Sequence, residues 1–162
     1  MFGSPTSSSL GTHDSIVIVA DTTSTLESKL KDGLVSINET GTGKISSILK
    51  FYSFMSIVSK FVKPDVVPFI CCRMIELSFT HGLTKYAPLA IIQFVAIICQ
   101  TSLVTNFQWA SETAKAAISM LGEFDASDVA PRVFLAYYGF VAPYTGWQKC
   151  VFMIYDAAIL LA

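Results

Sequence analysis

"APLAIIQFVAIICQTSLV", residues 87–104, decides the fold of this chain, because it runs for 18 residues without a charged side chain. As an α-helix it would be about 27 Å long, close to the thickness of a hydrocarbon core. It is therefore either a helix buried among other helices or a transmembrane helix. Gln93 and Gln100 lie seven residues apart and share one helical face, which favours the buried helix with a polar edge. Membrane insertion stays as the alternative.

The segments on both sides of this stretch predict further helices. Prolines suited to a first helical turn stand at 68, 88 and 131, and Gly82 suits the residue after a helix end. Helices are thus expected to begin near residues 66, 87, 107, 128 and 146, a spacing of about 20 residues. The sequence predicts an all-α fold of antiparallel helical hairpins, stacked as a tetratricopeptide/HEAT-like α-solenoid segment.

A separate helix is expected between Lys44 and Pro64, and the helix after residue 107 has a distinct pattern of small residues. The first has apolar residues spaced for one face, namely Ile45, Ile48, Leu49, Tyr52, Met55 and Val62. The second has a stripe that is mostly alanine, which lets helix axes approach to about 8 Å. This stripe, expected to pack against the preceding helix, comprises Phe107, Ala110, Ala114, Ala117, Ile118 and Leu121.

The start of the chain is rich in Ser, Gly, Pro and Thr, so residues 1–27 are predicted to be a disordered tail and residues 28–162 an incomplete α-helical repeat-like domain. Within the tail, Ser15–Asp21 is β-branched and could form a short strand. The first residues lack the features of a signal peptide, and the four cysteines lie in apolar stretches without a CxxC spacing. Buried reduced thiols and a cytoplasmic location are expected, with a membrane location as the alternative.

Sequence motifs for chemistry are weak. The segment from Asn38 to Ser46 resembles a phosphate-binding loop, but Asn38 replaces its first glycine and Ile45 its hydroxyl residue. The two histidines are far apart, and neither lies among clustered carboxylates. No catalytic, cofactor-binding or metal-binding residue is therefore assigned, no cofactor is expected, and the chain is not expected to be an enzyme. The net charge of the whole chain, −1, gives no electrostatic case for binding to nucleic acid or to anionic lipid.

Two charged pairs have the spacing of ion pairs on a helix surface. Arg73 and Glu76 are three residues apart, and Asp128 and Arg132 are four apart. Both pairs are expected to be structural.

The segment "PDVVPFICCRMIELSFTHGLTKYAP", residues 64–88, resembles a known family. It is similar to the tetratricopeptide-like helical region that follows the AAA-type predicted ATPase module in large hybrid serine/threonine kinase–sensor histidine kinase signalling proteins. The family pattern R-M-V-x-L-S-L-x-x-G is matched from Arg73 to Gly82. A helix pair follows in the family with a glycine on its second helix, where Ala110 stands here.

Further matches extend this resemblance to residues 30–149. The last six positions of the pattern L-L-x-x-F-x-A correspond to residues 121–126 with Phe124, an arginine in the next helix corresponds to Arg132, and a tryptophan before a basic residue corresponds to Trp147. The resemblance implies a fragment of such a protein, without the kinase, ATPase, GAF and histidine kinase motifs.

The expected function is therefore a non-catalytic helical scaffold, a protein-interaction segment of a signal-transduction ATPase or kinase. Its partners would be another protein or neighbouring domains. The alternative is a small integral membrane protein with one or more transmembrane helices, for which residues 87–104 are the best candidate.

Overall fold

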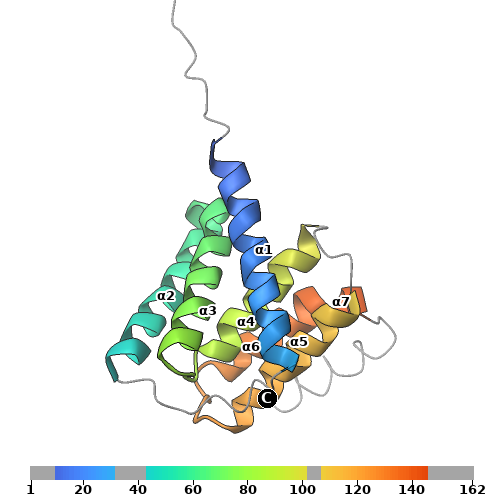
Figure 1. Cartoon of the computed structure of the whole chain (residues 1–162). Helices are drawn as coiled ribbons and strands as arrows, with labels where there is room; N and C mark the ends of the chain where they lie inside the picture. The colour runs from blue at the N-terminus through green and yellow to red at the C-terminus, as the bar shows by residue number, and fades with distance from the viewer. Residues whose placement is uncertain (1–9, 32–42, 102–106, 146–162) are drawn as a thin grey trace, which may run out of the picture.

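The computed structural model describes residues 10–31, 43–101 and 107–145 (Figure 1). These residues form α-helices joined by short turns, and no strand occurs among them, so the predicted all-α class is confirmed. The α-helices are α1 (Leu10–Lys31), α2 (Gly43–Val62), α3 (Val67–His81), α4 (Ala87–Gln100), α5 (Phe107–Ser119), α6 (Ala130–Ala136) and α7 (Ala142–Thr145). Short helical turns of other types are η2 (Pro64–Val66), η3 (Met120–Gly122) and η4 (Tyr137–Val141).

Helix α4 is the centre of the molecule. Of its 14 residues, 12 are buried, and it packs against α3, α5, α6 and η4. Side chains from every side of the helix, such as Leu89, Ile92 and Phe94, are fully covered. The predicted polar edge is buried at Gln93 and exposed at Gln100. The apolar character of residues 87–100 is thus accounted for by burial against other parts of this chain.

The neighbours of α4 follow the predicted sequence signals. Pro68, Pro88 and Pro131 all lie in first helical turns. Gly82 follows the last residue of α3 and has φ 99° and ψ 150°. Glycine can adopt this conformation because it has no Cβ. It differs from the left-handed helical conformation that is common after a helix C-terminus. Helix α5 packs against α4, and the alanines of its predicted stripe, Ala110, Ala114 and Ala117, are fully buried. The small side chains therefore serve close helix packing.

The N-terminal prediction is corrected by α1. Residues 10–27 were expected in a disordered tail, with a strand at 15–21, but they belong to a 22-residue helix that packs against α3 and α5. Leu26 is fully buried in this contact region. Tertiary packing therefore overrides the low helix propensity of the β-branched and polar residues. The threonines at 22, 23 and 25 donate hydrogen bonds to the carbonyl four residues earlier, which accommodates their hydroxyls. Residues 1–9 lie outside the described residues.

Pro143, a residue type that commonly ends a helix, does not end the helical segment that begins with α6. The helical backbone continues from α6 through the π-turn η4 into α7, which contains Pro143. A proline inside a regular helix lacks one N–H and clashes with the carbonyl four residues earlier. The wider π-turn just before it is a known way of accommodating such a break. The helix predicted over 146–162, with Trp147 and Cys150, lies outside the described residues.

The solenoid arrangement remains a prediction. In a solenoid each repeat contacts only its neighbours. Here the contacts centre on α4, and α1 packs against the non-adjacent α3 and α5 (Figure 1).

The close packing of α5 against α4 can be tested by enlarging one of the buried alanines of α5. We expect Ala114→Leu to lower the free energy of unfolding by about 1–3 kcal/mol, because the added atoms have no room at a fully buried position. Lys115→Leu on the exposed side of the same helix is the matched control, with an expected change within about 0.5 kcal/mol. Urea denaturation measures both, and equal effects would contradict the close packing.

Candidate functional site

Helix α2 has apolar side chains on both of its sides, and on the buried side, where Ile45, Tyr52 and Met55 pack against the core, serines lie among them. Its buried side chains are Leu49, Ser53, Ser56 and Ser59, three of them serines. The Ser56 hydroxyl donates a hydrogen bond to the Ser53 carbonyl at 2.8 Å, so this buried polar group is satisfied within the helix. The serine side of α2 faces the protein, where α2 packs against α3. Small side chains allow a close approach of two helices.

Large apolar side chains lie on the opposite side of α2, and we call them the α2 outer face. Phe61 is 86% exposed, Val62 78%, Phe51 62% and Phe54 61%. Positions 51, 54, 58 and 61 are spaced by three, four and three residues, which places them on one face of a helix. The complete α2 outer face comprises Phe51, Phe54, Ile57, Val58, Phe61 and Val62.

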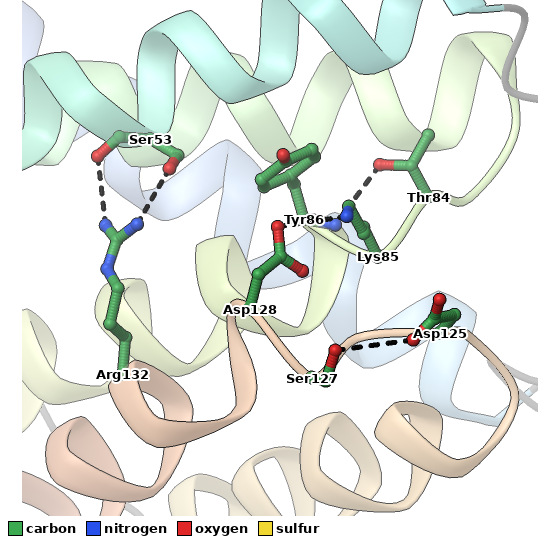
Figure 2. Close-up of polar contacts among 8 residues, drawn as sticks. All are labelled: Ser53, Thr84, Lys85, Tyr86, Asp125, Ser127, Asp128 and Arg132. Atoms are coloured by element: carbon green, nitrogen blue, oxygen red, sulfur yellow. Dashed lines mark hydrogen bonds and ion pairs between the residues drawn. The ribbon is translucent and has the colours of Figure 1, made fainter.

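A pair of hydrogen bonds fixes this orientation of α2. Arg132, on α6, donates from Nη1 to the Ser53 hydroxyl at 2.9 Å and from Nη2 to the Ser53 carbonyl at 3.0 Å (Figure 2). Partial burial lowers the pKa of the Arg132 guanidinium, and this is partly offset by the nearby Tyr86 and Asp128. Arg132 thus connects α6 to the serine side of α2, which leaves the phenylalanines outside.

The predicted ion pair between Asp128 and Arg132 is wrong. Asp128 instead pairs with Lys85 at 2.9 Å, which joins the α3–α4 turn to the turn before α6 (Figure 2). The hydrogen bond to Asp128 raises the pKa of Lys85. The Lys85 ammonium also lies 5.6 Å from the centre of the Tyr86 ring. The four-residue spacing would permit the predicted pair, but Asp128 binds Lys85 and Arg132 binds Ser53 instead. The predicted Arg73–Glu76 pair is confirmed at 2.6 Å.

A groove of about 590 Å³ lies between α1 and α3. Apolar residues such as Phe69, Ile75 and Phe79 line it together with polar ones. Four of its polar lining residues already have partners: Arg73 binds Glu76, and the hydroxyls of Thr22 and Thr25 donate to carbonyls of their own helix. Most of the polar lining of the groove is thus engaged within the protein.

The residues that carry the family resemblance have separate structural roles. Arg73 lies on the exposed side of α3, Gly82 ends that helix, and Ala110 is buried on α5. Phe124 is partly buried against the core, and Arg132 holds α2. Trp147 lies outside the described residues.

Groups with potential chemistry are dispersed or shielded. In the described part of the chain, no three His, Cys, Asp or Glu side chains are grouped to hold a metal ion. His81 is exposed at the end of α3, and Lys44 lies in the first turn of α2. Most of the phosphate-loop-like segment, residues 38–42, lies outside the described residues.

The cysteines that the structure describes are buried free thiols, as predicted. Burial and the neighbouring Cys72 raise the pKa of the Cys71 thiol to about 12. Cys71 also donates a long hydrogen bond, 3.8 Å, to the Gln93 side chain. Burial likewise raises the pKa of Cys72 and of Cys99. Cys150 lies outside the described residues.

The apolar face predicted for α2 lies mostly inward, as at Leu49 and Met55, whereas Val62 is exposed. The outer face was not predicted. The signal for the outer face was present in the second apolar series at 51, 54, 58 and 61, which alternates around the helix with serines at 53, 56 and 59.

Comparison with known proteins gives no assignment: no family model, no curated protein and no solved structure matches the chain. Among the described residues, one helix, α2, is long and apolar enough to cross a membrane by length and composition.

The role of Arg132 can be tested by truncation. We expect Arg132→Ala to lower the free energy of unfolding by about 1.5–3 kcal/mol, because it removes a charged donor from two hydrogen bonds at a partly buried site. Arg73→Ala, at an exposed ion pair, should lower the free energy of unfolding clearly less than Arg132→Ala does. Urea denaturation compares them, and an equal cost would contradict the role of Arg132 in holding α2.

The buried thiol of Cys71 predicts a pH dependence. Its pKa is raised from 9.0 when unfolded to about 12 when folded, so the unfolded state loses its proton first. The free energy of unfolding should therefore be unaffected below pH 9 and fall as the pH rises from 9 towards 12. We expect Cys71→Ala to make this fall shallower in urea titrations. An unchanged slope would show that the thiol is not buried.

Proposed function

We propose that this chain is a non-catalytic helical interaction module that docks through the α2 outer face. The observation that supports it is the cluster of exposed large apolar side chains on the outward side of α2, among them Phe54 and Phe61. Water-exposed clusters of large apolar side chains are rare on monomeric proteins and commonly mark interaction sites. Arg132 holds the helix in this orientation from the protein side. The exposed phenylalanines are therefore a fixed feature of the fold.

The fold does not need the α2 outer face for its stability. The contacts of α2 with α3 and α6 are made through its other side, at Leu49 and Ser53 among others. Serine at positions 54 and 61 would leave those contacts intact. Large apolar residues at exposed positions that contribute nothing to the core favour a role in binding.

The wider setting proposed for the module is a scaffold segment of a signal-transduction ATPase or kinase, located in the cytoplasm. This part of the proposal is based on the sequence resemblance over residues 30–149. Binding would act mechanically, since a docked helix can hold neighbouring domains in one arrangement. No residue is assigned a catalytic role.

Substitution of the outer face should separate binding from stability. We expect the double variant Phe54→Ser and Phe61→Ser to change the free energy of unfolding by no more than about 0.5 kcal/mol, because both side chains are mostly exposed. The same variant should lower the fluorescence of an apolar dye such as ANS added to the folded protein, because that dye binds exposed apolar surface. Leu49→Ser on the buried side is the control, with an expected loss of about 2–4 kcal/mol. A large loss of stability in the double variant would assign the phenylalanines to the fold instead.

Catalysis would overturn the non-catalytic part of the proposal. The decisive result would be specific ATP hydrolysis by the purified chain that Lys44→Ala abolishes and Lys50→Ala, on the same helix, leaves unchanged.

A further inference from the structure

We infer that the α2 outer face binds an anionic membrane surface, with α2 lying in the plane of the lipid headgroups and Phe61 and Val62 inserted between them. This inference rests on the proposed function, because it takes α2 as the docking element and names its partner as lipid.

The first argument is the charge of α2 and its end. Residues 43–66 contain four lysines and one acidic residue, Asp65, although the whole chain has a net charge of −1. All four lysines, Lys44, Lys50, Lys60 and Lys63, are exposed. A helix with an apolar face and flanking lysines is typical of segments that lie in the interface of anionic bilayers. The positive charge is therefore concentrated where the apolar side chains are.

The second argument is the shape of the C-terminal end of α2. Lys60, Phe61, Val62 and Lys63 are all exposed, and the chain turns immediately afterwards at Pro64. Phe61 and Val62 are the most exposed of the large apolar residues that the structure describes. Two apolar side chains between two lysines can enter the boundary between headgroups and acyl chains, while the ammonium groups remain at the phosphates.

The third argument is the width of the α2 outer face. At 100° per residue, its six side chains cover an arc of about 140°, and no polar residue between 51 and 62 lies within that arc, while Ser47 and Lys50 lie on the same side nearer the start of α2. One partner helix in a coiled coil would use a narrower seam of two positions per heptad, with charged residues beside it. A bilayer has no such seam and accommodates a broad, non-directional apolar surface. The width therefore favours lipid over a single helix of another protein.

A second copy of this chain is a poorer partner for α2. Two copies of α2 in contact would bring together lysines, with no carboxylate on either helix to pair with them. Like charges at an interface oppose association. A transmembrane orientation fits poorly as well, because Lys50 lies near the middle of the helix and the serine side is bound to α3 and Arg132. In-plane binding leaves these contacts in place.

Vesicle flotation tests this inference with the full chain. The probes are large unilamellar vesicles of phosphatidylcholine alone and of phosphatidylcholine with 30% phosphatidylserine. We expect the protein to float with the anionic vesicles, at least about tenfold more than with the neutral ones, and to be released by about 0.5 M salt. Bound protein floats whereas aggregated protein sediments, so aggregation cannot imitate binding.

Variants identify the binding surface. Phe61→Ser with Val62→Ser should lower binding to anionic vesicles at least about tenfold, because the inserted apolar area is lost. Lys60→Glu with Lys63→Glu should remove the preference for anionic lipid. Phe107→Ser is the matched control, since Phe107 is exposed on α5, away from α2 (Figure 1), and its binding should equal that of the original protein. Thermal unfolding followed by circular dichroism verifies that every variant is folded.

Other outcomes overturn the inference in distinguishable ways. Equal flotation of the original protein and the Phe61/Val62 variant would exclude lipid as the partner of this face. If the original protein then forms a dimer that the variant does not, the partner is a second copy and the interaction module stands. If both are monomeric and neither floats, the lipid inference fails and so does the role of Phe61 in docking. Retention of vesicle-bound protein in alkaline carbonate would indicate a transmembrane helix and contradict in-plane binding.

Discussion

Helix α4 is apolar except at Gln93 and Gln100, and the need to cover it organises the rest of the structure. A helix with so little polar surface must be covered on almost every side, either by lipid or by protein. In this chain the cover is protein: α3 and α5 pack along α4, and α6 and η4 complete the enclosure. The alanines of α5 and the glycine turn at Gly82 are local consequences, because both bring a neighbouring helix close to α4.

Helix α2, in contrast, is covered by the protein on one side only, and the proposed function is based on its uncovered side. It lies outside α3 and contributes a serine-lined side to the protein, held through Ser53 by Arg132. Its phenylalanines then have no place in the core. In water such a face is unfavourable, but against a lipid surface or another macromolecule it contributes binding free energy. The exposed apolar side of this helix thus connects the packing of the fold to the proposed docking role, and the lysines around it favour an anionic partner.

The sequence was informative wherever local signals and tertiary packing agree. Prolines in first turns, Gly82 and the alanine stripe predicted the boundaries of α3, α4 and α5 well, because each acts through backbone geometry or side-chain size. Prediction failed where tertiary contacts decide the outcome. Helix α1 has a strand-like composition and is stabilised by α3 and α5, and Arg132 prefers Ser53, 79 residues away, to the neighbouring Asp128. The orientation of α2 could not be predicted because both of its sides contain regularly spaced apolar residues. Only the tertiary contact with α3 determines which side is buried.

The central claim is that α4 is enclosed by the chain while the phenylalanines of α2 face outward. Hydroxyl-radical footprinting of the monomeric protein, read by mass spectrometry, measures this directly because oxidation follows side-chain exposure. The account predicts rapid oxidation of Phe54 and Phe61 and strong protection of Phe94, which is fully buried on α4. Oxidation of Phe94 at a rate similar to that of Phe61, or protection of Phe61 in the monomer, would contradict it.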